Sequence, residues 1–204
     1  MHEEVLSGQQ VKLLPLLGSF SGKFGLVGGT AIALHLGHRR SIDFDLFTLE
    51  ELDNEDIRSS FRKDHLIQET LVDQPNELSI VVNEVKITFL RYPFQIKFTE
   101  NFKDNINTPN LLTLAAMKAF SLGRRAKWKD YVDLYFVFKS ISFVDVAKRA
   151  KELFEGEFNE KLFREQLSYF EDIDYSETID YMLGFATGDE VVKKELKKIS
   201  LQKP

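Results

Sequence analysis

The chain of 204 residues contains no cysteine. This absence excludes disulfide bonds, zinc–thiolate sites and cysteine nucleophiles, and it is typical of proteins in a reducing cytosol. No apolar run approaches the roughly 20 residues that a membrane-spanning helix needs. The N-terminal stretch MHEEVLSGQQ also lacks the basic and apolar regions of a secretory signal peptide. We therefore expect a soluble, cytoplasmic protein without a membrane partner.

Positive charge is in deficit, with 27 Lys and Arg against 32 Asp and Glu and a net charge of -5. This balance argues against a protein that coats nucleic acid non-specifically, because such binding depends on clustered Lys and Arg. The basic residues gather in two places, GHRRS at residues 37–41 and GRRAKWK at residues 123–129. Two basic islands in an acidic chain favour a small anionic substrate or a single docked RNA.

Apolar periodicity divides the chain into an α/β half, residues 1–107, and a helical half, residues 108–204. In the first half we expect a helix at residues 4–17, a strand at 24–28, a helix at 30–36 and a strand at 41–47. A surface helix at 48–64, beginning near Thr48 or Asp53, and a hairpin at 78–91 should follow. In the second half we expect five helices, in residues 108–123, 127–140, 143–156, 158–172 and 189–200. The first of these should begin at Thr108 and Pro109 and end at Gly123.

Two acids stand inside the strand pattern SIDFDLF, residues 41–47. Alternation would put Ile42, Phe44 and Leu46 in the core, and Asp43 and Asp45 together on the opposite face. Two carboxylates so close repel each other, and a divalent cation relieves the repulsion. Magnesium prefers such oxygens, and a metal pair clamps phosphoryl displacement. The alternative is a solvated strand face, which is the commoner meaning of Asp-x-Asp.

A glycine pair, Gly28 and Gly29, precedes the expected helix at residues 30–36. Without side chains there, a phosphate can approach the helix N-terminus, where the amides of Thr30 and Ala31 are unpaired. The Thr30 hydroxyl is placed either to cap the helix or to contact a phosphate oxygen. Such a turn by itself is usually only a tight turn. Its combination with the acid pair is much harder to obtain by accident.

The stretch GGTAIALHLGHRRSIDFDLF, residues 28–47, resembles the signature of nucleotidyltransferases with the DNA polymerase beta-like fold. More narrowly, it is similar to the AbiEii/AbiGii toxin family of type IV toxin–antitoxin systems. LAAMKAFSLGRRAKWKDYVDLYFVFK, residues 114–139, resembles that family's later motifs, in which a helical lysine precedes a basic stretch and a D-x-x-D-L helix. The resemblance spans about residues 24–140.

This resemblance implies an α+β fold with a polymerase beta-like mixed sheet flanked by helices, followed by a helical lobe that closes the active-site cleft. It implies a transferase that depends on Mg²⁺ or Mn²⁺ and moves a nucleotidyl group from a nucleoside triphosphate to an acceptor. The acceptor would be an RNA, such as a tRNA end, or a protein hydroxyl. A cognate antitoxin would be encoded by a neighbouring gene.

Site roles follow from the resemblance residue by residue. Asp43 and Asp45 match the metal-binding acids, and both join Lys118 and Asp130 as catalytic residues. The residues matched to nucleotide binding are Gly28, Gly29, Thr30, Arg39, Ser41 and Lys118. The basic residues that follow either form a soluble loop or contact the triphosphate or an RNA backbone; they are Arg124, Arg125, Lys127 and Lys129.

One position departs from the family pattern. Polymerase beta-like enzymes generally carry a third carboxylate on a neighbouring strand, and here the matching strand VKITFL has Thr88 at that place. A threonine cannot act as a general base at neutral pH. Asp130, Asp133 or Glu84 could supply the missing carboxylate. The alternative is a catalytically reduced module that binds nucleotide and transfers slowly or not at all.

Overall fold

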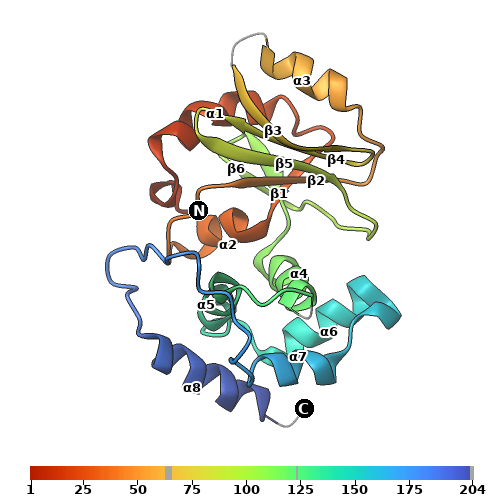
Figure 1. The fold of residues 1–204 in the computed structure, drawn as a ribbon. Helices are drawn as coiled ribbons and strands as arrows, with labels where there is room; N and C mark the ends of the chain where they lie inside the picture. The colour runs from red at the N-terminus through yellow and green to blue at the C-terminus, as the bar shows by residue number, and fades with distance from the viewer. Residues whose placement is uncertain (63–65, 123, 203–204) are drawn as a thin grey trace.

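The computed structural model describes residues 1–62, 66–122 and 124–202. Within these ranges a seven-stranded mixed sheet has the order β3-β4-β5-β2-β1-β7-β6, and it fills the upper half of the molecule in Figure 1. The strands are β1 Gly25–Val27, β2 Phe44–Thr48, β3 Ile67–Gln74, β4 Glu77–Val82, β5 Val85–Arg91, β6 Glu100–Phe102 and β7 Ile106–Thr108. β2 pairs with β5 and β1 with β7 in parallel, and the other neighbours are antiparallel. The predicted α+β class, with a mixed sheet flanked by helices, is confirmed.

Helices cover the sheet on both sides. They are α1 Gly8–Gly18, α2 Gly28–Leu36, α3 Asn54–Arg62, α4 Leu111–Leu122, α5 Trp128–Val137, α6 Phe143–Phe154, α7 Glu160–Gln166 and α8 Asp189–Ser200, with short 3₁₀ turns at Glu3–Val5 and Glu155–Glu157. In Figure 1, α3 lies on the side of the sheet away from α4–α8, and α2 lies between the sheet and α4 and α5. No helix in the described ranges is long and apolar enough to cross a membrane.

Helix α2 is buried on all sides because it is sandwiched between the sheet and the C-terminal helices. Its residues Ala31 to Leu34 are at most 1% exposed, as expected for a helix that is apolar all round. Gly37 ends the helix in the left-handed region, with φ 68°, where a glycine is favoured. The predicted strand–Gly-Gly–helix unit is therefore present, and the helix begins at Gly28 itself.

The two faces of β2 differ in burial. Phe44 and Leu46 are fully buried on one face, beside a cluster of aromatic rings contributed by Phe20, Phe24, Phe61 and Phe89. Asp45 and Phe47 are only partly buried on the other face. That second face of the sheet is directed towards α4 and carries the candidate site.

Two sequence expectations near these elements are wrong. Ile42 is 69% exposed because β2 begins only at Phe44. The residues before Phe44 form a loop, since β1 ends at Val27 opposite Asp45 and offers no strand further along. Helix α4 begins at Leu111 rather than at Thr108, because the Asn110 side chain caps it by accepting a hydrogen bond from the Thr113 amide at 2.9 Å.

The structure agrees with some of the expected helices and strands and differs from others. The hairpin of β4 and β5 and the helices α5, α6 and α8 lie close to where the sequence predicts them. Helix α7 ends at Gln166 rather than at residue 172, α3 begins at Asn54, next to Asp53, rather than at residue 48, and β3, β6 and β7 were not predicted. The end of α4 at Gly123 lies outside the described residues. One cluster of buried apolar side chains runs from the sheet into the C-terminal helices. The division into two lobes at residue 107 stays a prediction.

Candidate active site

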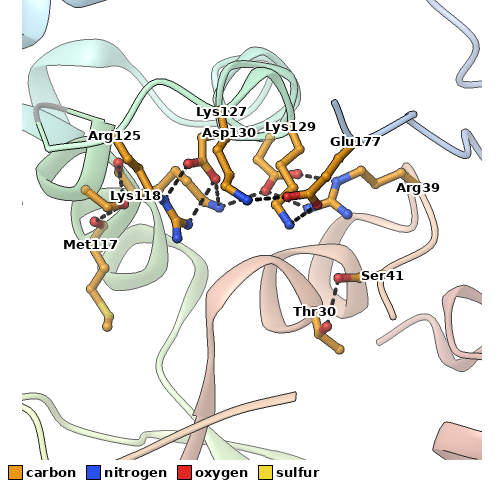
Figure 2. Close-up of polar contacts among 12 residues, drawn as sticks. Thr30, Arg39, Ser41, Met117, Lys118, Arg125, Lys127, Lys129, Asp130 and Glu177 are labelled. Atoms are coloured by element: carbon orange, nitrogen blue, oxygen red, sulfur yellow. Dashed lines mark hydrogen bonds and ion pairs between the residues drawn. The ribbon is translucent and has the colours of Figure 1, made fainter. Parts of the chain in front are cut away.

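The two acids of the motif lie at the junction of three elements. Asp45 stands in β2 between Val27 of β1 and Thr88 of β5. Asp43 precedes the strand, and its backbone carbonyl accepts a hydrogen bond from the Thr30 hydroxyl. The hydroxyl groups of Thr30 and Ser41 are also hydrogen-bonded at 2.8 Å, as Figure 2 shows. Thr30 and Ser41 therefore tie the loop that carries Asp43 to α2.

Each glycine of the pair makes room for a different charged side chain. A Cβ atom on Gly28 would lie 2.1 Å from an Asp45 carboxylate oxygen, and its φ of 73° already disfavours other residues. A Cβ atom on Gly29 would lie 2.6 Å from the Arg39 guanidinium. The sequence predicts that these glycines let a phosphate approach. The structure adds that they let Asp45 and Arg39 approach the start of α2.

The acid pair has no internal counter-ion. Among the described residues, the carboxylates of Asp43 and Asp45 make no hydrogen bond and no ion pair. Burial and then the charge of Asp43 raise the pKa of Asp45, and the nearby cations Lys118, Lys86 and Arg125 only partly oppose this. Asp45 is therefore an acid whose ionised form lacks a partner.

Asp45 faces a cleft of about 450 Å³ between the sheet and α4. The sheet side of the cleft is polar near Asp45, where Lys86, Thr88 and Ser79 line it, and apolar further along, where Phe47 and Tyr92 line it. The rings of Phe47 and Tyr92 stack with centroids 4.9 Å apart. The α4 side contributes Met117, Lys118 and Phe120, and Arg124 and Arg125 follow. The cleft thus combines two acids, Asp45 and Glu77, with several cations and an apolar end.

A buried charge cluster forms the wall behind this cleft. Asp133 of α5 accepts hydrogen bonds from Arg39 Nε at 2.7 Å and Nη2 at 2.9 Å, and it lies 2.8 Å from His38 Nε2 and 3.0 Å from Lys118 Nζ. Burial alone would raise the pKa of Asp133. Arg39, Lys118 and the hydrogen bond from His38 outweigh it and hold that pKa well below its ordinary value. Asp133 therefore anchors Arg39 and Lys118 as an ionised carboxylate.

Lys118 and Asp130 belong to the same cluster. Lys118 is 4% exposed and contacts Asp130 at 2.7 Å, and Arg125 donates to the other Asp130 oxygen at 2.9 Å. Burial would lower the pKa of Lys118, but Asp130 and Asp133 raise it above its ordinary value. Its ammonium donates a hydrogen bond to Asp130 and forms an ion pair with Asp133, which leaves donor capacity for a ligand.

The basic stretch after α4 is paired within the protein. Lys127 and Lys129 both contact Glu177, and burial, which would raise the pKa of Glu177, is outweighed by these lysines, so that pKa falls to about 2. Arg124 contacts Glu157 at 3.1 Å. Figure 2 shows the alternating charges that run from Arg125 to Arg39 along the start of α5. These cations therefore hold the segment around Glu177 against α5.

The strand position of the absent third acid is occupied by Thr88. Thr88 pairs directly with Asp45 in the parallel ladder, and its hydroxyl is 3.2 Å from Ser79. Asp130 and Asp133 are engaged with cations, and Glu84 is exposed in the β4–β5 turn. Glu77 of β4 is a second acid that lines the cleft. Sequence reasoning missed Glu77 because nothing in its local pattern separates it from a solvated strand residue.

The carboxylate oxygens of Asp43 and Asp45 fit a divalent metal whose remaining ligands come from a substrate. Within residues 1–62, 66–122 and 124–202, no group of three or more His, Asp or Glu side chains is arranged to hold a metal alone. Mg²⁺ usually binds through one or two carboxylates together with substrate phosphates and water. Asp43 and Asp45, whose carboxylates have no partner among the described residues, meet that requirement, and Asp45 lines a cleft that also carries Lys86, Lys118, Arg124 and Arg125.

Comparison with solved structures shows which known folds this fold is similar to. The chain superposes on MenT4, a nucleotidyltransferase toxin from Mycobacterium tuberculosis, with a TM-score of 0.60 and 14% identity, covering 95% of this chain and 82% of the other. The fold is similar to a nucleotidyltransferase fold. JHP933 from Helicobacter pylori gives the same TM-score at 15% identity, covering 96% of this chain and 91% of the other.

Sequence comparison adds one relative. An uncharacterized protein of Aquifex aeolicus is 28% identical over 156 residues, which is 73% of this chain and 74% of the relative. No protein-family model matches the chain.

Proposed function

We propose that this protein is a metal-dependent nucleotidyltransferase. It would move a nucleotidyl group from a nucleoside triphosphate to a hydroxyl of an RNA, such as a tRNA end, or of a protein, and release pyrophosphate. The observation that carries this proposal is the acid pair Asp43 and Asp45, whose carboxylates have no hydrogen-bond or ion-pair partner among the described residues. Asp45 lines a cleft that also carries the cations Lys86, Lys118, Arg124 and Arg125. The similarity to a nucleotidyltransferase toxin structure supports it.

The residues take the following roles in this proposal. Asp43 and Asp45 hold Mg²⁺ or Mn²⁺, which when bound offsets the negative charge of the phosphates and the leaving group. Thr30 and Ser41 fix the loop of Asp43. Lys118 presents its remaining donor to the substrate phosphates, and Asp130 and Asp133 fix its position. The start of α2, which no side chain caps, supplies backbone amides to an anion.

A specific observation favours a second candidate. Thr88 stands where a third carboxylate would be, Asp130 and Asp133 are engaged with cations, and Glu77, the other acid that lines the cleft, pairs with Leu90 rather than with Thr88 beside Asp45. The chain would then be a catalytically reduced nucleotide-binding module of the same fold. This module would bind Mg²⁺ and nucleotide but release no pyrophosphate over long incubation.

Transfer is tested with nucleoside triphosphates labelled at the α-phosphate, each incubated with the protein, Mg²⁺ or Mn²⁺, and either total RNA or cell protein. We expect label in one acceptor with one or more nucleotides, and none when EDTA removes the metal. Label that is incorporated equally in EDTA would contradict metal dependence. Metal-dependent nucleotide binding without pyrophosphate release would favour the reduced module.

A toxin role in a type IV-like toxin–antitoxin system, with a cognate antitoxin from a neighbouring gene, is also part of the proposal. It is supported by the similarity to MenT4, which is a nucleotidyltransferase toxin. Expression should then arrest growth, and co-expression of the neighbouring gene should relieve the arrest. Unimpeded growth on expression of protein that is active in the transfer assay would rule the toxin role out.

A further inference from the structure

Lys86 of β5 lies on the cleft face of the sheet, close to the acid pair. Ile87 and Phe89 are fully buried on the opposite face of the strand, so alternation turns Lys86 and Thr88 to the cleft, which both line. Phe44 pairs with Ile87, and Asp45 pairs with Thr88. Lys86 therefore stands one residue before the first of these pairs, at the end of β5 nearest Asp43. Its charge acts on the Asp45 carboxylate.

Lys86 differs from the other cations of the cleft in being unpaired. Lys118 and Arg125 contact Asp130, and Arg124 contacts Glu157. Lys86 is exposed and forms no ion pair or hydrogen bond with any described residue. A lysine on a strand is usually just solvated. Lys86 is instead an ammonium group near the Asp45 carboxylate. Neither group has a hydrogen-bond or ion-pair partner in the part of the chain that the structure describes, and both residues line a cleft large enough for a ligand.

We propose that Lys86 binds the polyphosphate of the nucleoside triphosphate and holds it against Asp43 and Asp45. This inference rests on the proposed function and deepens it by assigning one end of the cleft to the polyphosphate and the other end to the nucleoside. The polyphosphate lies at the polar end, where the positive charge of Lys86 is not paired with a carboxylate of any described residue. The nucleoside lies towards the apolar end, beside Phe47, Tyr92 and Phe120. Lys118 and Arg125 form the opposite wall.

The test compares Lys86→Gln with Lys148→Gln in the full chain. Lys148 is also exposed, makes no ion pair among the described residues, and lies on α6 outside the cleft. Calorimetry measures binding of inorganic tripolyphosphate, and separately of a nucleoside triphosphate, in the presence of Mg²⁺. Acetylation of each lysine by acetic anhydride, read by mass spectrometry with and without tripolyphosphate, supplies a second readout that needs no activity.

We expect Lys86→Gln to weaken tripolyphosphate binding by about tenfold or more, since a hydrogen bond to a charged group contributes about 1.5–3 kcal/mol. Lys148→Gln should bind like the unaltered protein, and Lys86→Arg should retain most of the affinity because it keeps the charge. Tripolyphosphate should protect Lys86, but not Lys148, from acetylation. Thermal stability of all three variants should be unchanged, because neither lysine makes a contact that folding requires.

Two results separate failure of this inference from failure of the proposed function. If the unaltered protein binds tripolyphosphate with Mg²⁺, and Lys86→Gln binds it equally while Lys86 stays reactive, the role of Lys86 is overturned and the proposed function stands. If the unaltered protein binds neither tripolyphosphate nor any nucleoside triphosphate in Mg²⁺, both are overturned.

Discussion

Asp45→Asn should lower the transfer rate by about 10²–10³-fold while leaving the protein at least as stable as before. The rate falls because a neutral carboxamide cannot replace an anionic metal ligand, and loss of one preorganised charge contact in an active site typically costs about 10²–10³-fold. Asp43→Asn should have an effect in the same direction. Steady-state label transfer measures both, and Asp104→Asn, at an exposed aspartate in the β6–β7 turn, is the matched control.

Asp45→Asn should raise the stability of the protein although it lowers its activity. Burial and Asp43 raise the pKa of Asp45 in the folded protein, so its ionised form is less favourable there than in the unfolded chain. Without metal, ionisation of Asp45 therefore lowers the free energy of unfolding, and this cost disappears as the pH falls through the raised pKa. Asn removes the cost, and we expect the metal-free Tm to rise. A fall in Tm together with lost activity would mean that the substitution acts through unfolding instead.

Asp133→Ala should destabilise the protein severely. It leaves the Arg39 guanidinium without its two-point acceptor and removes one of the two carboxylates around Lys118, and both cations are at most 5% exposed. Breaking a buried ion pair in this way typically costs about 3–5 kcal/mol. The Tm should fall by about 10 °C, since about 2–4 °C is lost per kcal/mol at this chain length.

An exposed pair supplies the control for Asp133→Ala. Glu165 contacts Lys161 at 3.7 Å, and the two side chains are 59% and 85% exposed, so Glu165→Ala should cost no more than about 1 kcal/mol. Urea denaturation measures both variants. Similar small losses would contradict the anchoring role of Asp133. Because the folded pKa of Asp133 is well below 3.8, its stabilisation should be complete above that pH and disappear as the pH falls through the folded value.

The elements that position the acids could be predicted from local patterns. A few neighbouring residues determine the apolar run of α2, its end at Gly37 and the alternation of β2. Ile42 was placed wrongly because the end of a strand depends on its neighbour, and β1 stops at Val27. Strand β3 was missed because its residues are mostly exposed and show no apolar face.

The charge cluster behind the cleft is non-local, and this limits prediction. Arg39 and Asp133 are 94 residues apart and meet only because α2 and α5 pack together. The sequence marked Lys118, Asp130 and Asp133 as important, yet it could not show that the three bind one another. It also offered no reason to separate Lys86 from an ordinary surface lysine, since its position beside Asp45 depends on the parallel pairing of β2 and β5.

The most direct test of the central claim is calorimetric titration of a non-hydrolysable nucleoside triphosphate, with Mg²⁺ or with EDTA, into the unaltered protein and into the double variant Asp43→Asn/Asp45→Asn. The claim is that these two carboxylates bind the nucleotide through a shared metal. We expect binding by the unaltered protein that requires Mg²⁺, and loss of that metal-dependent binding in the folded double variant. Equal affinity in EDTA, or undiminished Mg²⁺-dependent binding by the double variant, would contradict it.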